Sequence, residues 1–294
     1  MPSDASLTSF LERLLGPVAR VDARPHPEST SFPLQELRVA LHDGSELELV
    51  LKDLRWSGLS DTARRAKPDF LHDPAREIET YREILSTTSL GSAVFYGAEG
   101  PLLLIENVDG SALWQVGELA VWCDVAQKIA EFHRELASQV KNRCLLPYDA
   151  DFYGLWLERA EAFAGPLEAV ARCHEDVVKR LLSLPQTVIH GELYASNIVV
   201  AGTRVCPVDW ELAGAGPGLL DLAALTTGWA DADQATIAAA YGDVDEDDLD
   251  CCRLQLALRW LGWSRTWKPP AAHARDWRAE ALGAAERLGT RRAR

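Results

Sequence analysis

Hydrophobic residues recur at helical spacing at the start of the chain, and the pattern then changes to alternation. Residues 5–15 (A-S-L-T-S-F-L-E-R-L-L) predict a short helix that stops at Gly16. Over residues 18–54, apolar and polar positions alternate in three runs, and H-D-G-S at 42–45 separates the last two. A period of two interrupted by a tight turn is typical of paired strands. This region therefore predicts a three-stranded antiparallel meander.

Three further elements follow before the pattern changes again. Residues 56–73 are polar and basic, and we expect a loop or an insertion there. A helix is predicted over 74–86, because Pro74 is suited to the first position of a helix. A pair of strands is expected around 93–96 and 101–106.

Nearly all of the sequence after residue 110 has helical periodicity. Helices are predicted over 112–138, 152–164, 167–184, 218–229, 232–241 and 246–266. Short strands around 187–189, 198–200 and 205–208 are the exceptions. A small β-rich part followed by a larger helical part predicts an α+β fold of two lobes with a cleft between them. We place the lobes at 1–107 and 108–294, with a hinge at about 103–110.

Composition narrows the class of protein. With 47% hydrophobic and 25% charged residues, the chain is an ordinary globular sequence. No apolar run approaches the roughly 18 residues that a membrane span needs, and the N-terminus has no secretory signal pattern. We therefore expect a cytoplasmic protein with no membrane partner. The six cysteines form no C-x-x-C motif, which argues against a zinc site or a disulfide framework.

The chain is acidic, with a net charge of −14 and a pI near 5.0. Nucleic-acid binding depends on basic surface, so we exclude nucleic acid as a partner. A cationic or neutral small molecule suits this charge better. The acidic run at 243–250 lacks the glycine and glutamate of a calcium-binding loop, and we expect a solvated helix N-terminus there.

Two short motifs carry the chemistry. H-G-E-L-Y-A-S-N occupies 190–197, and V-C-P-V-D-W-E occupies 205–211. A histidine, a carboxylate, an asparagine and then a strand ending in a second carboxylate match the layout of a kinase catalytic loop and its metal-binding strand. This spacing suggests phosphoryl transfer.

Phosphoryl transfer requires that the phosphates are held, that magnesium bridges them and that the acceptor hydroxyl is aligned. Asn197 and Asp209 are candidate Mg²⁺ ligands, because this ion favours carboxylate and phosphate oxygens. Glu192 is the candidate base for the acceptor hydroxyl. Lys52, late in the third strand, is a candidate phosphate contact, and Glu77 on the next helix is the carboxylate that would hold it.

Together these motifs resemble the aminoglycoside phosphotransferase and choline kinase family, a branch of the protein kinase-like fold. Other matching features fall in the expected order: E-x-x-x-Y at 77–81, the hinge-like L-L-L-I-E-N at 102–107, A-E-F-H at 130–133 and G-L-L-D-L-A-A-L at 218–225. The resemblance implies ATP or GTP as the donor, Mg²⁺ as the metal and a hydroxylated small molecule as the acceptor.

The resemblance also assigns residues. It implies that Asn197 and Asp209 bind the metal, Lys52 and Glu77 serve the donor phosphates, and Glu106 in the hinge run contributes to the nucleotide site. His190 belongs to the catalytic loop, where we expect it to brace the loop rather than act as a base. Asp221 follows Gly218 and opens an apolar helix, so its position in the sequence leads us to expect that it caps the helix or ties backbone amides near the metal strand.

Two departures from the family pattern are important. The family usually has aspartate where this chain has Glu192. The loop at 26–31 has no glycine, although Ser29, Thr30 and Ser31 offer hydroxyls and amides to a phosphate.

One extra methylene moves a carboxylate by roughly 1.5 Å, and a displacement of about 1 Å can cost about a hundredfold in rate. General-base help is itself typically worth only about 10²–10⁴-fold, and both metal positions are kept. We therefore predict an active kinase. The alternatives are an inactive pseudokinase that binds a nucleotide or metabolite, and an enzyme that transfers a nucleotidyl group.

The C-terminal tryptophans Trp260, Trp263 and Trp267 recur on one face of a helix. This spacing indicates first of all a packing stripe. Stacking on a cationic or cyclic acceptor is the alternative.

Overall fold

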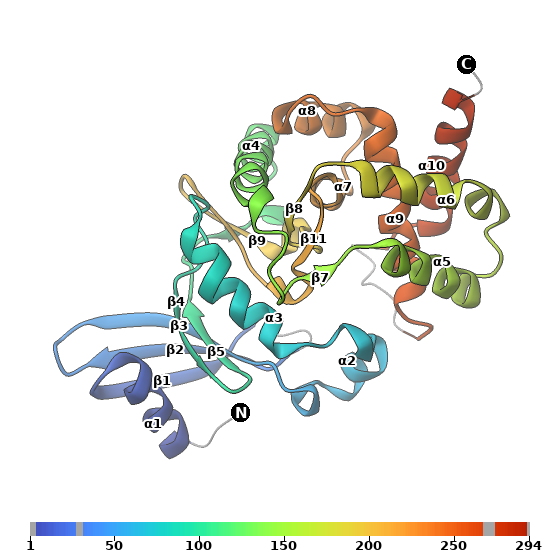
Figure 1. Ribbon diagram of the computed structural model, residues 1–294. Helices are drawn as coiled ribbons and strands as arrows, with labels where there is room; N and C mark the ends of the chain where they lie inside the picture. The colour runs from blue at the N-terminus through green and yellow to red at the C-terminus, as the bar shows by residue number, and fades with distance from the viewer. Residues whose placement is uncertain (1–3, 28–31, 267–273, 293–294) are drawn as a thin grey trace.

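The computed structural model describes residues 4–27, 32–266 and 274–292 (Figure 1). It begins with helix α1 (Asp4–Leu15) and the strands β1 (Val18–Pro25), β2 (Leu34–Leu41) and β3 (Glu46–Asp53). The predicted antiparallel meander is confirmed, and β5 (Leu102–Glu106) and β4 (Phe95–Glu99) extend it to five strands in the order β1-β2-β3-β5-β4. Helix α1 buries Phe10 and Leu11 against this sheet. The sheet therefore has its own small core.

Residues 56–73, where we expected a loop or an insertion, contain short helical elements. They contain a helical turn at Trp56–Gly58, the short helix α2 (Asp61–Ala66) and a second turn at Asp69–Leu71. Ser60 caps α2 by accepting a hydrogen bond of 3.1 Å from the Ala63 amide. A helix of six residues is too short to show a periodic pattern in a polar sequence, which explains why α2 was not predicted.

The predicted helix over 74–86 exists but changes its winding. Helix α3 (Pro74–Glu79) is capped by Asp73, which accepts from the Ala75 amide at 3.0 Å. It continues through a wider π turn at Thr80–Ile84 and a 3₁₀ turn at Leu85–Thr87. Such turns are common where a helix must aim a functional side chain.

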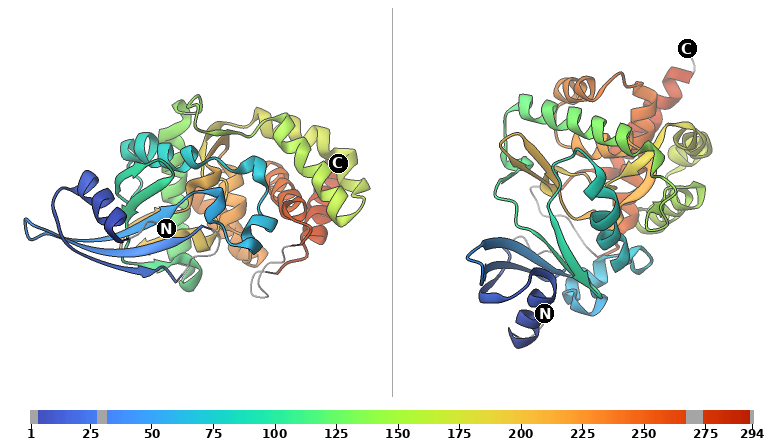
Figure 2. Two further views of the ribbon diagram at one scale, coloured as in Figure 1. Left: turned by 90° about the horizontal axis from the view of Figure 1, so that it is seen from below. Right: turned by 60° about the vertical axis from the view of Figure 1, so that its left-hand side comes forward.

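Helices dominate the rest of the molecule, as predicted. They are α4 (Leu119–Glu135), α5 (Ala150–Ala164), α6 (Glu168–Ser183), α7 (Leu219–Leu225), α8 (Asp231–Tyr241), α9 (Glu246–Trp263) and α10 (Trp277–Arg292). Helix α10 was not predicted. The helix expected from residue 112 begins only at Leu119, after the short strand β6 (Ser111–Ala112) and a turn at Leu113–Gln115. Figure 2 shows the β-rich lobe at one end of the molecule and the helices gathered at the other.

Two small sheets inside the helical lobe position the candidate chemistry. One contains β10 (Arg204–Pro207), β9 (Ile198–Ala201) and β6; the other contains β7 (Leu146–Pro147), β11 (Gly214–Pro217) and β8 (Gln186–Ile189). The catalytic motif 190–197 connects β8 to β9, and Asp209 follows β10. The strands β7 and β11 were not predicted, because G-A-G-P has no alternating pattern.

The two lobes are the β-rich and helical parts of the predicted α+β, kinase-like fold. One continuous core of buried residues runs from Leu103 in the sheet through Trp122 and Trp156 to Trp210. The division at 107/108, with a hinge at about 103–110, stays a prediction. Within the described residues, no helix is both long and apolar enough to cross a membrane.

Candidate active site

Lys52 connects three segments that are far apart in the sequence. It lies on β3 between Leu34 of β2 and Leu103 of β5, and it is 6% exposed. Its Nζ lies 2.7 Å from Glu77 Oε2 on α3 and donates a hydrogen bond to Asp209 Oδ1. The structure thus brings together the lysine, the helix carboxylate and the strand carboxylate.

The charges of this cluster are set by competition between burial and pairing. Burial alone would lower the pKa of Lys52, but Asp209 and Glu77 raise it above its ordinary value. Burial raises the pKa of Glu77 to about 7, against the opposing charge of Lys52. Burial would also raise the pKa of Asp209, but Lys52 outweighs it and holds that pKa below the ordinary value. Asp209 is therefore the ionised carboxylate of the cluster.

Asp209 has an unusual backbone. With φ of 68° and ψ of 59°, it is the one non-glycine residue in the described ranges that has a positive φ. The next residue, Trp210, is fully buried and donates from Nε1 to Pro207 O at 3.0 Å, which fixes the chain on both sides of Asp209. Left-handed backbone outside glycine costs about 1–3 kcal/mol and is concentrated at functional sites. The side chain of Asp209 is 40% exposed, so an ion can reach its carboxylate.

The catalytic loop is held by Asp221 at the start of α7. The Asp221 carboxylate accepts from the amides of His190 at 2.7 Å and Gly191 at 2.9 Å, and it lies 3.2 Å from His133 Nε2. Burial would raise the pKa of Asp221, but His133 and His190 hold it below the ordinary value. The expectation that Asp221 ties backbone amides is confirmed.

Gly191 is required by the close packing of this loop. Its φ is +82°, and a Cβ atom there would lie 2.3 Å from the Tyr148 hydroxyl and 2.5 Å from Leu212 O. No other residue type fits without moving the backbone. The glycine of H-G-E is therefore a structural requirement.

His190 is fully buried, and backbone groups engage both of its ring nitrogens. Nε2 donates to Val208 O at 2.8 Å, and Nδ1 accepts from the Glu192 amide at 3.2 Å. Burial lowers its pKa, so the ring is neutral. This geometry supports the bracing role and leaves no ring nitrogen to act as a base.

Glu192 and Asn197 face the same region from opposite ends of the loop. Asn197 Nδ2 donates to Glu192 O at 2.9 Å, and Asn197 O accepts from the Val208 amide at 2.8 Å, next to Asp209. Within the described residues, the Glu192 carboxylate has no hydrogen-bond partner. Burial raises the pKa of Glu192 to about 7; Arg259 opposes this rise, and the carboxylates of Glu211 and Asp209 add to it.

These residues fit a hard divalent cation. Asp209 supplies an accessible carboxylate. Asn197 donates a hydrogen bond from Nδ2 to Glu192 O, so Oδ1 is the end of its side chain that can accept. Magnesium is usually held by one or two such oxygens together with substrate phosphates. A set of three or more His, Cys, Asp or Glu side chains that could hold a metal ion is not found in the described residues.

The remaining predicted nucleotide contacts have different outcomes. Ser29, Thr30 and Ser31 lie outside the described residues. The Glu106 carboxylate is 2.6–2.7 Å from two Arg204 nitrogens and accepts from the Val94 amide at 3.0 Å. The bond from Arg204 lowers the pKa of Glu106 although burial opposes it. These bonds already occupy the side chain of Glu106, so its part in nucleotide binding stays a prediction and is weakened.

Two basic residues near Glu192 were not predicted from the sequence to belong to the site. Arg259 on α9 is 7% exposed and donates to the Tyr194 hydroxyl at 3.2 Å. Lys67 donates to Glu211 Oε2, and its Nζ lies 4.5 Å from the centre of the Phe32 ring. Lysine is rare in this chain, with six residues against 24 arginines. That rarity was the one available signal for Lys67.

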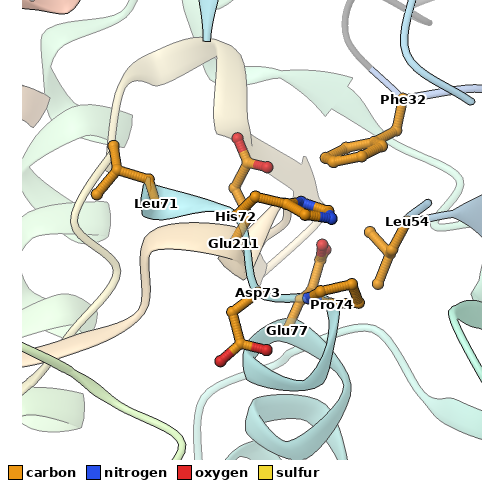
Figure 3. Close-up of a pocket in the computed structure, with 8 residues that line it drawn as sticks. All are labelled: Phe32, Leu54, Leu71, His72, Asp73, Pro74, Glu77 and Glu211. Atoms are coloured by element: carbon orange, nitrogen blue, oxygen red, sulfur yellow. The ribbon is translucent and has the colours of Figure 1, made fainter. Parts of the chain in front are cut away.

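Residues 56–73, which carry Lys67, contact both lobes, and we call them the crossing segment. They leave β3, reach Glu211 beside the metal strand through Lys67, and place the Phe70 ring 5.9 Å from that of Trp156 on α5. A small pocket lies alongside (Figure 3), lined by Phe32 and Leu54 of the β-rich lobe and by His72, Glu77 and Glu211. In Figure 3, Phe32, Leu54 and His72 face one another above α3, and Glu77 points toward them.

Comparison with known proteins gives a family and a fold. Residues 38–254 match the phosphotransferase enzyme family. Among curated proteins, no sequence matches this chain.

The fold matches solved structures over nearly the full length. A macrolide 2'-phosphotransferase from Brachybacterium faecium has 17% identity and a TM-score of 0.63, covering 96% of this chain and 98% of its own. A choline kinase from Streptococcus pneumoniae has 13% identity and a TM-score of 0.59, with 97% and 96% covered. An amicoumacin kinase in complex with AMP-PNP, Ca²⁺ and Ami has 12% identity and a TM-score of 0.59, with 98% and 94% covered.

Proposed function

Because this chain belongs to the phosphotransferase enzyme family, we propose that it transfers the γ-phosphoryl group of ATP or GTP to a hydroxyl of a small molecule. One observation carries the proposal. Lys52, Glu77 and Asp209 come from three distant segments and meet in one cluster, beside the loop that holds Glu192 and Asn197. Mg²⁺, held by Asp209 and Asn197, would neutralise charge on the phosphates when it is bound.

Lys52 has the position of a phosphate-binding cation. In the described structure its ammonium group lies between Glu77 and Asp209. Glu77 is 1% exposed on α3 and keeps the lysine in place. We expect Lys52 to contact donor phosphate oxygens while Glu77 holds it.

Glu192 is the proposed base. A carboxylate with a pKa of about 7 is ionised in a large fraction of molecules at neutral pH and accepts a proton more readily than an ordinary glutamate. In the reaction, the acceptor oxygen forms a bond to Pγ as the bond from Pγ to the bridging oxygen breaks. The hydroxyl proton passes to Glu192, and the nucleoside diphosphate leaves.

The surroundings of Glu192 bear on the acceptor. The net charge of the chain suggested a cation, but Arg259 and Lys67 both act on Glu192 and offset nearby carboxylates. The overall acidity therefore carries little information about the acceptor charge. We propose a hydroxylated small molecule and assign no charge to it.

The test begins with binding and turnover of Mg-ATP. We expect Mg-AMP-PNP to raise the melting temperature and an ATP-consumption screen of hydroxylated metabolites to identify an acceptor. Asp209→Asn should abolish turnover, whereas the exposed surface change Glu175→Gln on α6 should leave it unchanged. No binding and no turnover in the wild-type protein would contradict the proposal.

Glu192→Asp separates an enzyme from an inactive relative. An enzyme built around glutamate should lose turnover or at best keep it, because shortening the side chain withdraws the base. A gain of turnover from an inactive wild-type protein would instead identify a pseudokinase.

A further inference from the structure

The crossing segment positions Lys67 at the candidate active site. Lys67 directly follows α2, and its amide donates to Ala63 O at 2.8 Å, which closes that helix. Pro68 comes next and cannot continue a helix, so the backbone turns to an extended conformation at Lys67. The side chain leaves this turn toward the interior and is only 6% exposed.

The crossing segment is fixed on the C-terminal side of this turn. Arg76 Nη1 donates to Leu71 O at 2.9 Å and to Glu211 O at 2.7 Å, so one guanidinium joins the segment to the strand region after Asp209. One residue earlier, Arg159 of α5 lies 5.2 Å from the Phe70 ring. Lys67 therefore occupies a defined position rather than the end of a mobile loop.

The contacts of Lys67 leave bonding capacity unused. An ammonium group has three N–H donors. Within the described residues, Glu211 is its one hydrogen-bond acceptor, and the Phe32 ring covers another side at 4.5 Å. The same ring lies 5.7 Å from Lys52 Nζ, so both lysines converge on Phe32.

Stability alone is a weak reason to bury this pair. Removing two charges from water costs several kcal/mol, and apolar replacements of a buried ion pair are often neutral or better. The position has a clearer explanation in the reaction. Glu211 is two residues from Asp209, and Lys52, which shares the Phe32 ring with Lys67, donates a hydrogen bond to Asp209. Lys67 therefore lies on the same side of the site as the proposed phosphate-binding lysine and metal ligand, where the transferred phosphoryl group would lie.

We propose that Lys67 is a catalytic residue that donates hydrogen bonds to the non-bridging oxygens of the transferred phosphoryl group, a role that rests on the proposed kinase function. Negative charge is spread over those oxygens in the transition state. The acceptor oxygen bonds to Pγ, the bond to the leaving diphosphate breaks, and the hydroxyl proton goes to Glu192. Lys67 transfers no proton in this step.

The test uses Mg-ATP hydrolysis, with water as the acceptor, together with Mg-AMP-PNP binding. Lys67→Gln keeps a hydrogen bond to Glu211 but removes the cation. We expect kcat to fall about 10²-fold or more while the Kd of Mg-AMP-PNP changes less than about threefold. Lys179→Gln, at a lysine with a 65% exposed side chain on α6, is the matched control and should leave both values unchanged. Asp209→Asn defines the background rate.

A second measurement distinguishes a catalytic role of Lys67 from a purely structural one. In Lys67→Ala, added ethylammonium should restore part of the lost kcat, which a purely structural role would not predict. If Lys67→Gln does not fold, the double variant Lys67→Gln, Glu211→Gln leaves no unpaired buried charge and takes its place, with Glu211→Gln as its reference.

The outcomes are distinguishable. Wild-type kcat in Lys67→Gln, with Asp209→Asn inactive, would overturn the role of Lys67 and leave the kinase function intact. A loss confined to nucleotide affinity would also overturn it. If the wild type shows no turnover that depends on Asp209, both the kinase function and the role of Lys67 are contradicted.

Discussion

The catalytic region at 190–211 and the crossing segment at 56–73 serve the same site in different ways. In the catalytic region, the proposed base and both proposed metal ligands come from one short stretch, and its backbone fixes their spacing. From the crossing segment we propose one contributing side chain, Lys67, whose surroundings come from Glu211 and Phe32. Functional residues that lie close together in the sequence form a recognisable motif, whereas functional residues that only the fold brings together do not.

The largest effect should come from the catalytic region. Asp209→Asn keeps the shape of the side chain and tolerates the left-handed backbone at this position, but it removes the ionised metal ligand. We expect Mg-ATP turnover to fall by about 10³-fold or more. Initial rates across a range of Mg²⁺ concentrations measure this, and a loss of less than tenfold would contradict the metal assignment.

Glu192→Gln tests the base within the same region. We expect kcat to fall by about 10²–10³-fold, because the amide cannot accept the hydroxyl proton. In the wild type, kcat/KM should rise with pH and level off above about 7, since the carboxylate must be ionised to act and its pKa is about 7. The variant should lack this rise. A pH profile unchanged by the substitution would assign the titration to another group.

Arg76→Gln tests the connection between the two regions. It removes the guanidinium that bonds Leu71 O and Glu211 O, and leaving buried carbonyls unpaired costs about 1–3 kcal/mol of unfolding free energy. Arg64→Gln is the control, since Arg64 is 40% exposed and bonds carbonyls only within the crossing segment. Urea unfolding measures both. Equal losses would show that the connection adds no stability.

The smallest effect concerns stability and pH. Because the pKa of Glu192 is raised from 4.5 to about 7, the folded protein keeps a proton that the unfolded chain has lost over this window, and wild-type stability falls as pH rises through it. Glu192→Gln should therefore come close to the wild type in unfolding free energy near pH 5 and exceed it near pH 8. A variant that is less stable at pH 8 would show that Glu192 is stabilised by pairing instead.

Much of the fold could be predicted because its signals are local. The alternating runs at 18–54 gave the meander, and the binding of backbone amides by Asp221 followed from its place at the start of an apolar helix. The acidic run at 243–250 contains the cap of α9, as Asp245 accepts from the Asp247 amide at 2.8 Å. The prediction that this run is solvated was wrong for Asp250, which is fully buried and pairs with Arg287 at 2.8 Å.

The rest depends on distant partners that no local pattern shows. Trp260 and Trp263 were expected to form one packing stripe, yet Trp260 stacks on Trp277 of α10 at 5.1 Å and Trp263 on Trp156 of α5 at 6.0 Å. Trp267 lies outside the described residues. Arg259 was not predicted to be a site residue, because the sequence of α9 has the pattern of a helix that packs in the core. Its proximity to Glu192 arises only when α9 packs under the catalytic loop.

The most direct test of the kinase function is phosphorus NMR of Mg-ATP incubated with the wild-type protein and with Asp209→Asn. We expect the wild type to produce ADP together with inorganic phosphate, or a phosphate monoester when an acceptor is present, and Asp209→Asn to leave ATP unchanged. Release of AMP and pyrophosphate would identify nucleotidyl transfer and contradict the proposal. Unchanged ATP in both samples, with and without the screened acceptors, would contradict it as well.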